Sequence, residues 1–189
     1  MISRIVILML LSLPAMAQST TNRLNFKSGQ SQMIGVYQGT IFVNGQRAHQ
    51  FATDNIVYKS KRNKLVEDKN SVFLFIETLG EAGKKNRLNV FNIVFSRADS
   101  ITSVVASDVK DFDRDGYLEF GGSEVATPHP SADSLYYLPA EFYEIKKGHV
   151  AFDAEYTQMI DNKVNGTYLV SPLNKNGQCC VAIPKKKKK

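Results

Sequence analysis

Residues 71–79 (SVFLFIETL) and residues 87–95 (RLNVFNIVF) are the two stretches that decide the fold. The first is the most apolar β-like run outside the N-terminal region, and the second alternates apolar side chains with asparagine. The polar residues 80–86 between them are typical of a turn. This order predicts a long central hairpin whose inner faces build the hydrophobic core.

Shorter β-like runs surround this hairpin. Residues 33–43 lead into Asn44-Gly45, a strong hairpin signal because both positions tolerate positive φ, and residues 47–51 would return as the partner strand. Residues 101–106 also fit helical spacing, but their β-branched side chains favour a strand. Further short strands are expected at residues 55–58, 64–66, 117–120, 136–138, 141–145, 150–152 and 168–170, with Gly121-Gly122 ending the strand at 117–120.

One helix is expected, at residues 153–165. Asp153 suits the N-cap, Glu155 suits the first turn, and Gly166 suits the C-terminal end. Apolar side chains follow helical spacing between these ends, at Tyr156, Met159, Ile160 and Val164. We therefore expect a mainly β fold, a single antiparallel β domain (a sandwich or a propeller-like sheet) with one helix in its C-terminal half.

The two ends of the chain differ from this domain in composition. Residues 1–17 combine a basic Arg4, an apolar run and an A-x-A ending, which predicts a secretory signal peptide; a buried helix or a membrane anchor is the alternative. Residues 18–31 are polar and predict a flexible entry segment. The β domain then covers residues 32–178, and residues 179–189 form a tail. We expect a secreted or periplasmic protein with no transmembrane span after residue 17.

The net charge of +6 does not indicate nucleic-acid binding. Arg4 and lysines 185–189 account for six of the 24 basic residues, and the remaining 18 balance the 18 acidic residues. A lysine run of this kind is typical of a solvated tail, and a role near an anionic surface stays open. We expect no nucleic-acid partner.

The only cysteines, Cys179 and Cys180, are neighbours and cannot join distant parts of the chain. In an oxidising compartment they would form a vicinal disulfide, pair with another chain or stay reduced, and the sequence leaves these alternatives open. Two thiols without histidines at ligand spacing are a poor metal site. The fold is expected to form without a long-range disulfide.

Residues 111–119 (DFDRDGYLE) carry the clearest functional pattern. Four carboxylates lie within these nine residues, at Asp111, Asp113, Asp115 and Glu119. They would repel one another without a cation among them, and Ca²⁺ accepts crowded, irregular oxygen ligation. Gly116 permits a sharp turn, and the residue after it conventionally offers its carbonyl oxygen. The predicted metal ligands are therefore Asp111, Asp113, Asp115, Tyr117 and Glu119, with Ca²⁺ as the ion.

This pattern is not an EF-hand, because its twelfth position is Gly122 in place of glutamate, and Gly121-Gly122 oppose a helical exit. The residues VKDFDRDGYLEFGG instead resemble the calcium loops of the FG-GAP and integrin β-propeller type, DxDxDGxxD/E between short strands, with Glu119 where Asp is more usual. They are also similar to the acidic loop of I-type periplasmic lysozyme inhibitors, which are small secreted β proteins. Since the chain has no repeat of fixed period, we expect one β domain and not a full propeller.

No catalytic motif is found in the sequence. The histidines His49, His129 and His149 each stand alone, and there is no nucleophile elbow or Gly-rich phosphate loop. We expect a secreted, non-catalytic, calcium-binding β domain that binds a protein or glycan partner. Two alternatives stay open. One is a glycan or cell-wall hydrolase with structural calcium, its acids sought at Glu141, Glu144 and Asp153; the other is an enzyme inhibitor of the lysozyme-inhibitor type.

Overall fold

The computed structural model describes residues 22–185. The predicted signal peptide and lysines 186–189 lie outside the described residues. The first eight strands are β1 Arg23–Lys27, β2 Met33–Tyr37, β3 Thr40–Val43, β4 Gln46–Gln50, β5 Lys64–Asp68, β6 Ser71–Thr78, β7 Arg87–Val94 and β8 Arg97–Val105. The remaining elements are β9 Leu118–Ser123, β10 Ser134–Tyr136, β11 Ala140–Lys146, β12 His149–Phe152, helix α1 Ala154–Asn165 and β13 Ala182–Pro184.

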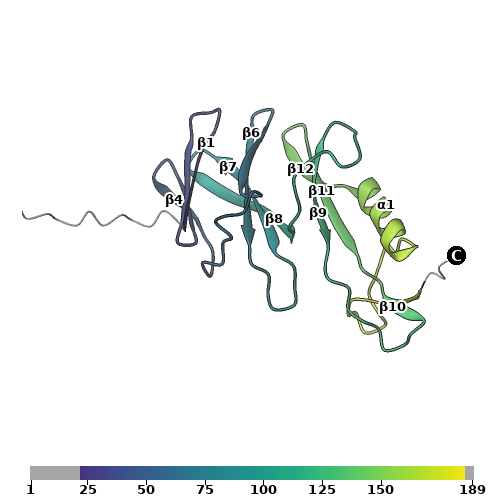
Figure 1. Ribbon diagram of the computed structural model, residues 1–189. Helices are drawn as coiled ribbons and strands as arrows, with labels where there is room; N and C mark the ends of the chain where they lie inside the picture. Colours follow the sequence, from purple (N-terminus) through teal and green to yellow (C-terminus); the bar gives the residue numbers. More distant parts are fainter. Residues whose placement is uncertain (1–21, 186–189) are drawn as a thin grey trace, which may run out of the picture.

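Three antiparallel sheets and the helix follow one another as layers (Figure 1). Sheet A has the strand order β1-β2-β3-β4, sheet B the order β5-β6-β7-β8, and sheet C the order β12-β11-β9. Strands β10 and β13 form a separate two-stranded sheet. The predicted fold class is therefore confirmed: residues 22–185 are mainly β, their sheets are antiparallel, and they contain one helix in the C-terminal half.

Sheet B is the centre of the stack because both of its faces are covered. On β6, Val72, Leu74 and Ile76 pack towards sheet A, whereas Phe73 and Phe75 pack towards sheet C. Side chains on opposite faces of a strand alternate, so a strand between two layers is apolar at nearly every position. The predicted central hairpin of β6 and β7 is confirmed, and it contributes to two cores.

The predicted hairpin at Asn44-Gly45 is also confirmed, with φ of 52° and 81° between β3 and β4. A second turn of the same kind lies earlier, where Gln38 and Gly39 have φ of 46° and 68°. The stretch predicted as one run over residues 33–43 is therefore two paired strands, β2 and β3. The hairpin signal of Gln38-Gly39 is weaker than that of Asn-Gly, because glutamine tolerates positive φ less well than asparagine.

Four other predictions about strands are wrong. Residues 23–27, expected within a flexible segment, form β1, because Leu24 and Phe26 pack into the core between sheets A and B. Strand β9 continues through Gly121-Gly122 to Ser123. Glycine is needed at position 121 because the neighbouring strand comes so close that a Cβ would lie 2.0 Å from the carbonyl oxygen of Glu141. Residues 55–58 make only one isolated bridge, and residues 168–170 form no strand.

The helix begins and ends where the sequence predicts. Asp153 is the N-cap and accepts a hydrogen bond from the amide of Tyr156, and Gly166 ends the helix with φ of 83°. The face that packs on sheet C is more polar than predicted, because Met159 and Val164 are about half exposed. Its buried polar side chains are Thr157, Asp161 and Asn165, which hydrogen-bond to residues between Tyr137 and Phe142.

The C-terminal segment is part of the fold up to β13. The sequence predicts a tail over residues 179–189. Residues 182–184 are instead part of the fold, because they form β13 and pair with β10. Cys179 and Cys180 are joined by a vicinal disulfide, one of the three alternatives left open. Among residues 22–185, no helix is long and apolar enough to cross a membrane.

Candidate metal centre

The acidic loop lies between β8 and β9 and is closed by the backbone at its base. The amide of Lys110 donates to the carbonyl of Glu119 over 3.1 Å, and the amide of Glu119 donates to the carbonyl of Lys110 over 3.0 Å. This antiparallel bridge fixes where the loop starts and where it ends. The eight residues between its two members must therefore form a compact turn.

Aspartate side chains hold the turn from within. The carboxylate of Asp111 accepts hydrogen bonds from the amides of Arg114, over 2.6 Å, and Gly116, over 3.2 Å. Asp113 accepts from the amide of Asp115 over 3.1 Å. Gly116 has φ of 94°, in the left-handed region that favours glycine, and a Cβ there would meet no atom within 4 Å. The glycine is therefore required by the backbone conformation and not by lack of space.

The four predicted carboxylates converge on one point. Asp111, Asp113, Asp115 and Glu119 each offer one oxygen, and these four oxygens all lie within 4.8 Å of one another. Carboxylates that close repel one another strongly unless a cation or protons offset their charge. The arrangement provides oxygen ligands only, which is the chemistry of a hard divalent cation.

Glu119 differs from the three aspartates in its environment. It lies at the start of β9 with 1% of its surface exposed, and its Oε2 accepts a hydrogen bond from the amide of Phe112 over 2.6 Å. Its Oε1 is buried and has no hydrogen-bond partner within residues 22–185. Burial, assisted by the charges of the three aspartates, raises the pKa of Glu119 to about 7. A cation bound through Oε1 would give this atom the partner that it lacks.

The underside of the loop is aromatic. The ring of Phe112 stacks on Tyr156 of α1, with centroids 5.8 Å apart, and meets Phe142 of β11 edge to face at 6.0 Å. These three rings belong to the core between sheet C and the helix. The acidic cluster therefore rests on a packed surface, which limits how far the loop can move. Phe112 was not predicted as part of the site, although its position between two aspartates marks it as an apolar residue in a polar loop.

Tyr117 was predicted to supply a backbone oxygen. Its amide donates to Asp115 over 2.9 Å, and the ammonium of Lys146 lies 4.3 Å from the centre of its ring. These contacts place Tyr117 beside the cluster and fix its side chain on the surface of sheet C. Metal binding by the carbonyl oxygen of Tyr117 remains a prediction.

The carboxylates sought for a hydrolase do not gather in one cavity. Asp153 caps the helix, Glu144 pairs with Lys146 at 3.1 Å, and Glu141 lines a small cavity beside the helix. None of these three carboxylates has a buried oxygen without a hydrogen-bond partner, so this feature does not mark any of them as catalytic. Of the three histidines, His49 packs against Phe51 and Phe91, and its burial lowers its pKa.

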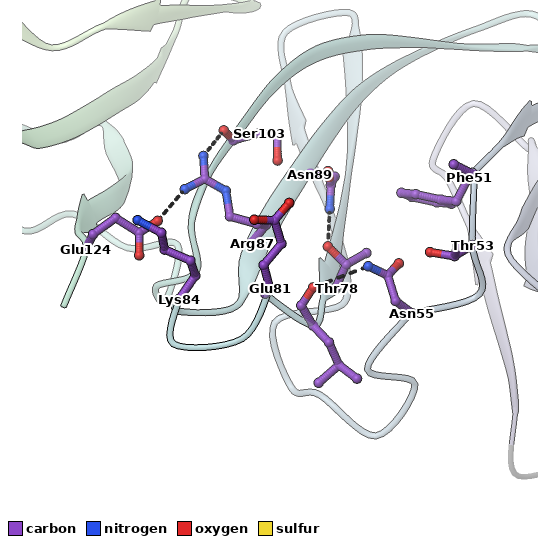
Figure 2. A pocket seen from close by; sticks show the side chains of 13 residues that line it. Phe51, Thr53, Asn55, Thr78, Glu81, Lys84, Arg87, Asn89, Ser103 and Glu124 are labelled. Atoms are coloured by element: carbon purple, nitrogen blue, oxygen red, sulfur yellow. Dashed lines mark hydrogen bonds and ion pairs between the residues drawn. The ribbon is translucent and has the colours of Figure 1, made fainter. Parts of the chain in front are cut away.

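A second cavity, of about 470 Å³, lies where the chain leaves sheet A and passes the end of the β6–β7 hairpin (Figure 2). Its two carboxylates are Glu81 and Glu124, and Arg87 neutralises Glu124 through an ion pair of 3.0 Å. Arg87 also donates to the carbonyl of Ser103, and Asn89 donates to Thr78 over 2.9 Å. Most polar groups in Figure 2 are therefore bonded to one another and hold the hairpin in place.

Comparison of the chain with protein families, with curated proteins and with solved structures found no match in any of the three. The resemblance of the loop to FG-GAP calcium loops and to lysozyme inhibitors therefore stays a prediction. The site is defined by its own geometry: four converging carboxylates, one of them buried with a free oxygen, on a loop fixed from below.

Proposed function

We propose that the chain is a secreted, calcium-binding β domain that catalyses no reaction and binds a protein or glycan partner. The observation that carries the proposal is the buried Oε1 of Glu119, which has no hydrogen-bond partner among the described residues and belongs to a carboxylate that clusters with those of three aspartates. A buried carboxylate oxygen without a partner is unfavourable, and a bound cation removes that cost.

Calcium fits this cluster better than magnesium. Three of the four carboxylates come from one short, irregular turn, and Ca²⁺ tolerates irregular coordination with six to eight oxygens, whereas Mg²⁺ demands a near-ideal octahedron. With four negative charges, the site needs only moderate affinity to be occupied outside cells, where calcium sites with dissociation constants of ~10⁻⁴ to 10⁻³ M suffice.

The bound metal would stabilise the fold. The loop joins β8 of sheet B to β9 of sheet C, and its Phe112 packs against α1. A cation that fixes the loop would therefore stabilise the contact between these layers, so that folding and binding are linked. The partner would bind elsewhere, on a surface that the layers hold in shape.

The proposal is tested by thermal or urea unfolding of the protein with chelator and with calcium. At a free calcium concentration of 100 times the dissociation constant, we expect unfolding to require about 2.7 kcal/mol more than with chelator. Asp113→Asn should remove most of this gain, and Asp99→Asn, an exposed aspartate on β8, should keep it. An unfolding curve of the wild-type protein that is the same in calcium and in chelator would overturn the proposal.

A further inference from the structure

Among sheets A, B and C, the outer face of sheet A is the one face within the described residues that no other layer covers. Its inward side chains, among them Ile34, Val36 and Ile41, build the core with sheet B. On the other face lies a shallow cavity of about 790 Å³ over β1, β2 and β3. Side chains that point to this face and line the cavity are Arg23, Asn25, Met33, Tyr37 and Phe42.

Strand register places these side chains in two rows across the sheet. In one row Arg23 of β1 pairs with Tyr37 of β2. In the next, Asn25 pairs with Gly35, Gly35 with Phe42, and Phe42 with Arg47 of β4. Rows of this kind lie about 7 Å apart along the strands. Each arginine is therefore the cross-strand neighbour of an aromatic ring, one at each edge of the sheet.

Gly35 forms the floor of the cavity. Its φ is not in the left-handed region, so the backbone does not require glycine at this position. A Cβ would have only one neighbour within 4 Å, the Oδ1 of Asn25 at 3.8 Å, so packing does not require glycine either. Its effect is on the surface, since it leaves a hollow between the rings of Tyr37 and Phe42.

The charge on this face has one sign. The chain has no aspartate or glutamate before Asp54, whereas sheet A carries Arg23, Lys27 and Arg47. Within residues 22–185, neither arginine forms an ion pair, and the Nε of Arg23 donates only to Asn25, over 3.2 Å. Unpaired guanidinium groups beside aromatic rings favour a ligand that has carboxylates and flat apolar surfaces.

We propose that the outer face of sheet A binds an acidic polysaccharide, with its sugar rings packed on Tyr37 and Phe42 and its carboxylates paired with Arg23 and Arg47. A pyranose ring has an apolar face that suits an aromatic side chain and hydroxyl groups that suit Asn25. The inference rests on the proposed function, because it names the partner class and the surface of that secreted domain. Three cations are few for a nucleic acid, whose backbone carries one charge per nucleotide.

Binding is tested by calorimetry with a hyaluronate hexasaccharide, which has a carboxylate on alternate sugars, and with the same hexasaccharide after reduction of its carboxyl groups. We expect the acidic form to bind about tenfold or more tightly than the reduced form, with an affinity that falls as salt rises. The double variant Arg23→Gln, Arg47→Gln should lose about tenfold or more in affinity. Lys163→Gln, which removes an exposed charge on α1, is the matched control and should bind as the wild type does.

Gly35→Val tests the hollow without changing charge. Valine suits a strand and its Cβ has room at this position on the outer face, so the variant should fold normally and lose binding. Equal affinity for the acidic and the reduced hexasaccharide, or unchanged affinity in Gly35→Val and in the double arginine variant, would overturn the inference. Tighter binding of a single-stranded oligonucleotide or an acidic peptide of equal charge would overturn it in favour of that ligand. A calcium-dependent unfolding curve without hexasaccharide binding would reject this inference and retain the calcium site.

Discussion

The amide of Phe112 donates a hydrogen bond of 2.6 Å to the Oε2 of Glu119, and this bond joins the first half of the acidic loop to the strand that follows it. The bond uses one oxygen of Glu119, and the other oxygen has no hydrogen-bond partner within residues 22–185. Hydrogen bonds within the protein therefore hold the loop in a shape that suits a cation, and these bonds do not depend on a cation. Such preorganisation reduces the ordering that binding would otherwise require.

Glu119→Gln should separate the metal site from the stability of the fold. The amide oxygen can still accept from Phe112, and the amide nitrogen can donate to the aspartates in place of a repelling charge. In chelator we expect the variant to be more stable than the wild type by roughly 1–3 kcal/mol, and in calcium to show little further gain. Urea unfolding in both buffers measures the two effects. A variant less stable than the wild type in chelator would contradict this account.

Gly116→Ala should weaken the loop through its backbone. A residue with a Cβ is strained at φ of 94°, and the change should cost about 1–2 kcal/mol and lower calcium affinity. Since no atom lies within 4 Å of the position that the new Cβ would occupy, a steric clash does not contribute. Arg114→Gly, in the same loop at φ of 70°, is the matched control and should not weaken calcium binding. Calorimetry with calcium distinguishes the two variants.

Glu77 should make the protein sensitive to acid. Its burial alone would raise its pKa, but hydrogen bonds from Ser60, Asn86 and Arg62, with the charge of Arg62, outweigh burial and lower it. The stabilising effect of the ionised group is therefore complete above its ordinary pKa of 4.5 and is lost as pH falls through the lower pKa of the folded state. Unfolding free energies measured between about pH 3 and 7 should fall on the acid side, and less steeply in Glu77→Gln.

The N-cap of the helix should affect the metal site at a distance. Asp153→Ala should cost about 1 kcal/mol of stability, because the amide of Tyr156 loses its acceptor. Tyr156 also stacks on Phe112 under the loop, so the loosened first turn should lower calcium affinity as well. Asp153→Ser, which preserves a capping oxygen, should restore both quantities. Loss of stability without any change in calcium affinity would show that the helix does not support the loop.

Local signals in the sequence were sufficient for the hairpin at Asn44-Gly45, the helix caps and the acidic loop, but not for the hairpin at Gln38-Gly39. Asn44-Gly45, Asp153 and Gly166 act on their immediate neighbours, so their effects are visible without knowledge of the fold. The four carboxylates were also predicted, because their spacing in one short turn already brings them together.

Long-range contacts were not visible in the sequence. Strand β1 is polar on one side, and it is ordered because Leu24 and Phe26 pack into the core between sheets A and B. Gly121 by itself indicates the end of a strand, yet the close approach of β11 makes it part of one. The burial of Glu119 depends on sheet C and the helix, so the free oxygen that distinguishes the site from a solvated acidic turn could not be inferred from its neighbours.

The serial order of the layers has a consequence for local opening. Sheet B is shielded on both faces, whereas sheet A lies at one end of the stack and α1 at the other (Figure 1). Backbone amides of β6 and β7 should therefore exchange with solvent deuterium more slowly than those of either end. Because Phe112 of the loop packs on Phe142 of sheet C and on Tyr156 of the helix, calcium should slow exchange in β9, β11 and α1 more than in β1 to β4.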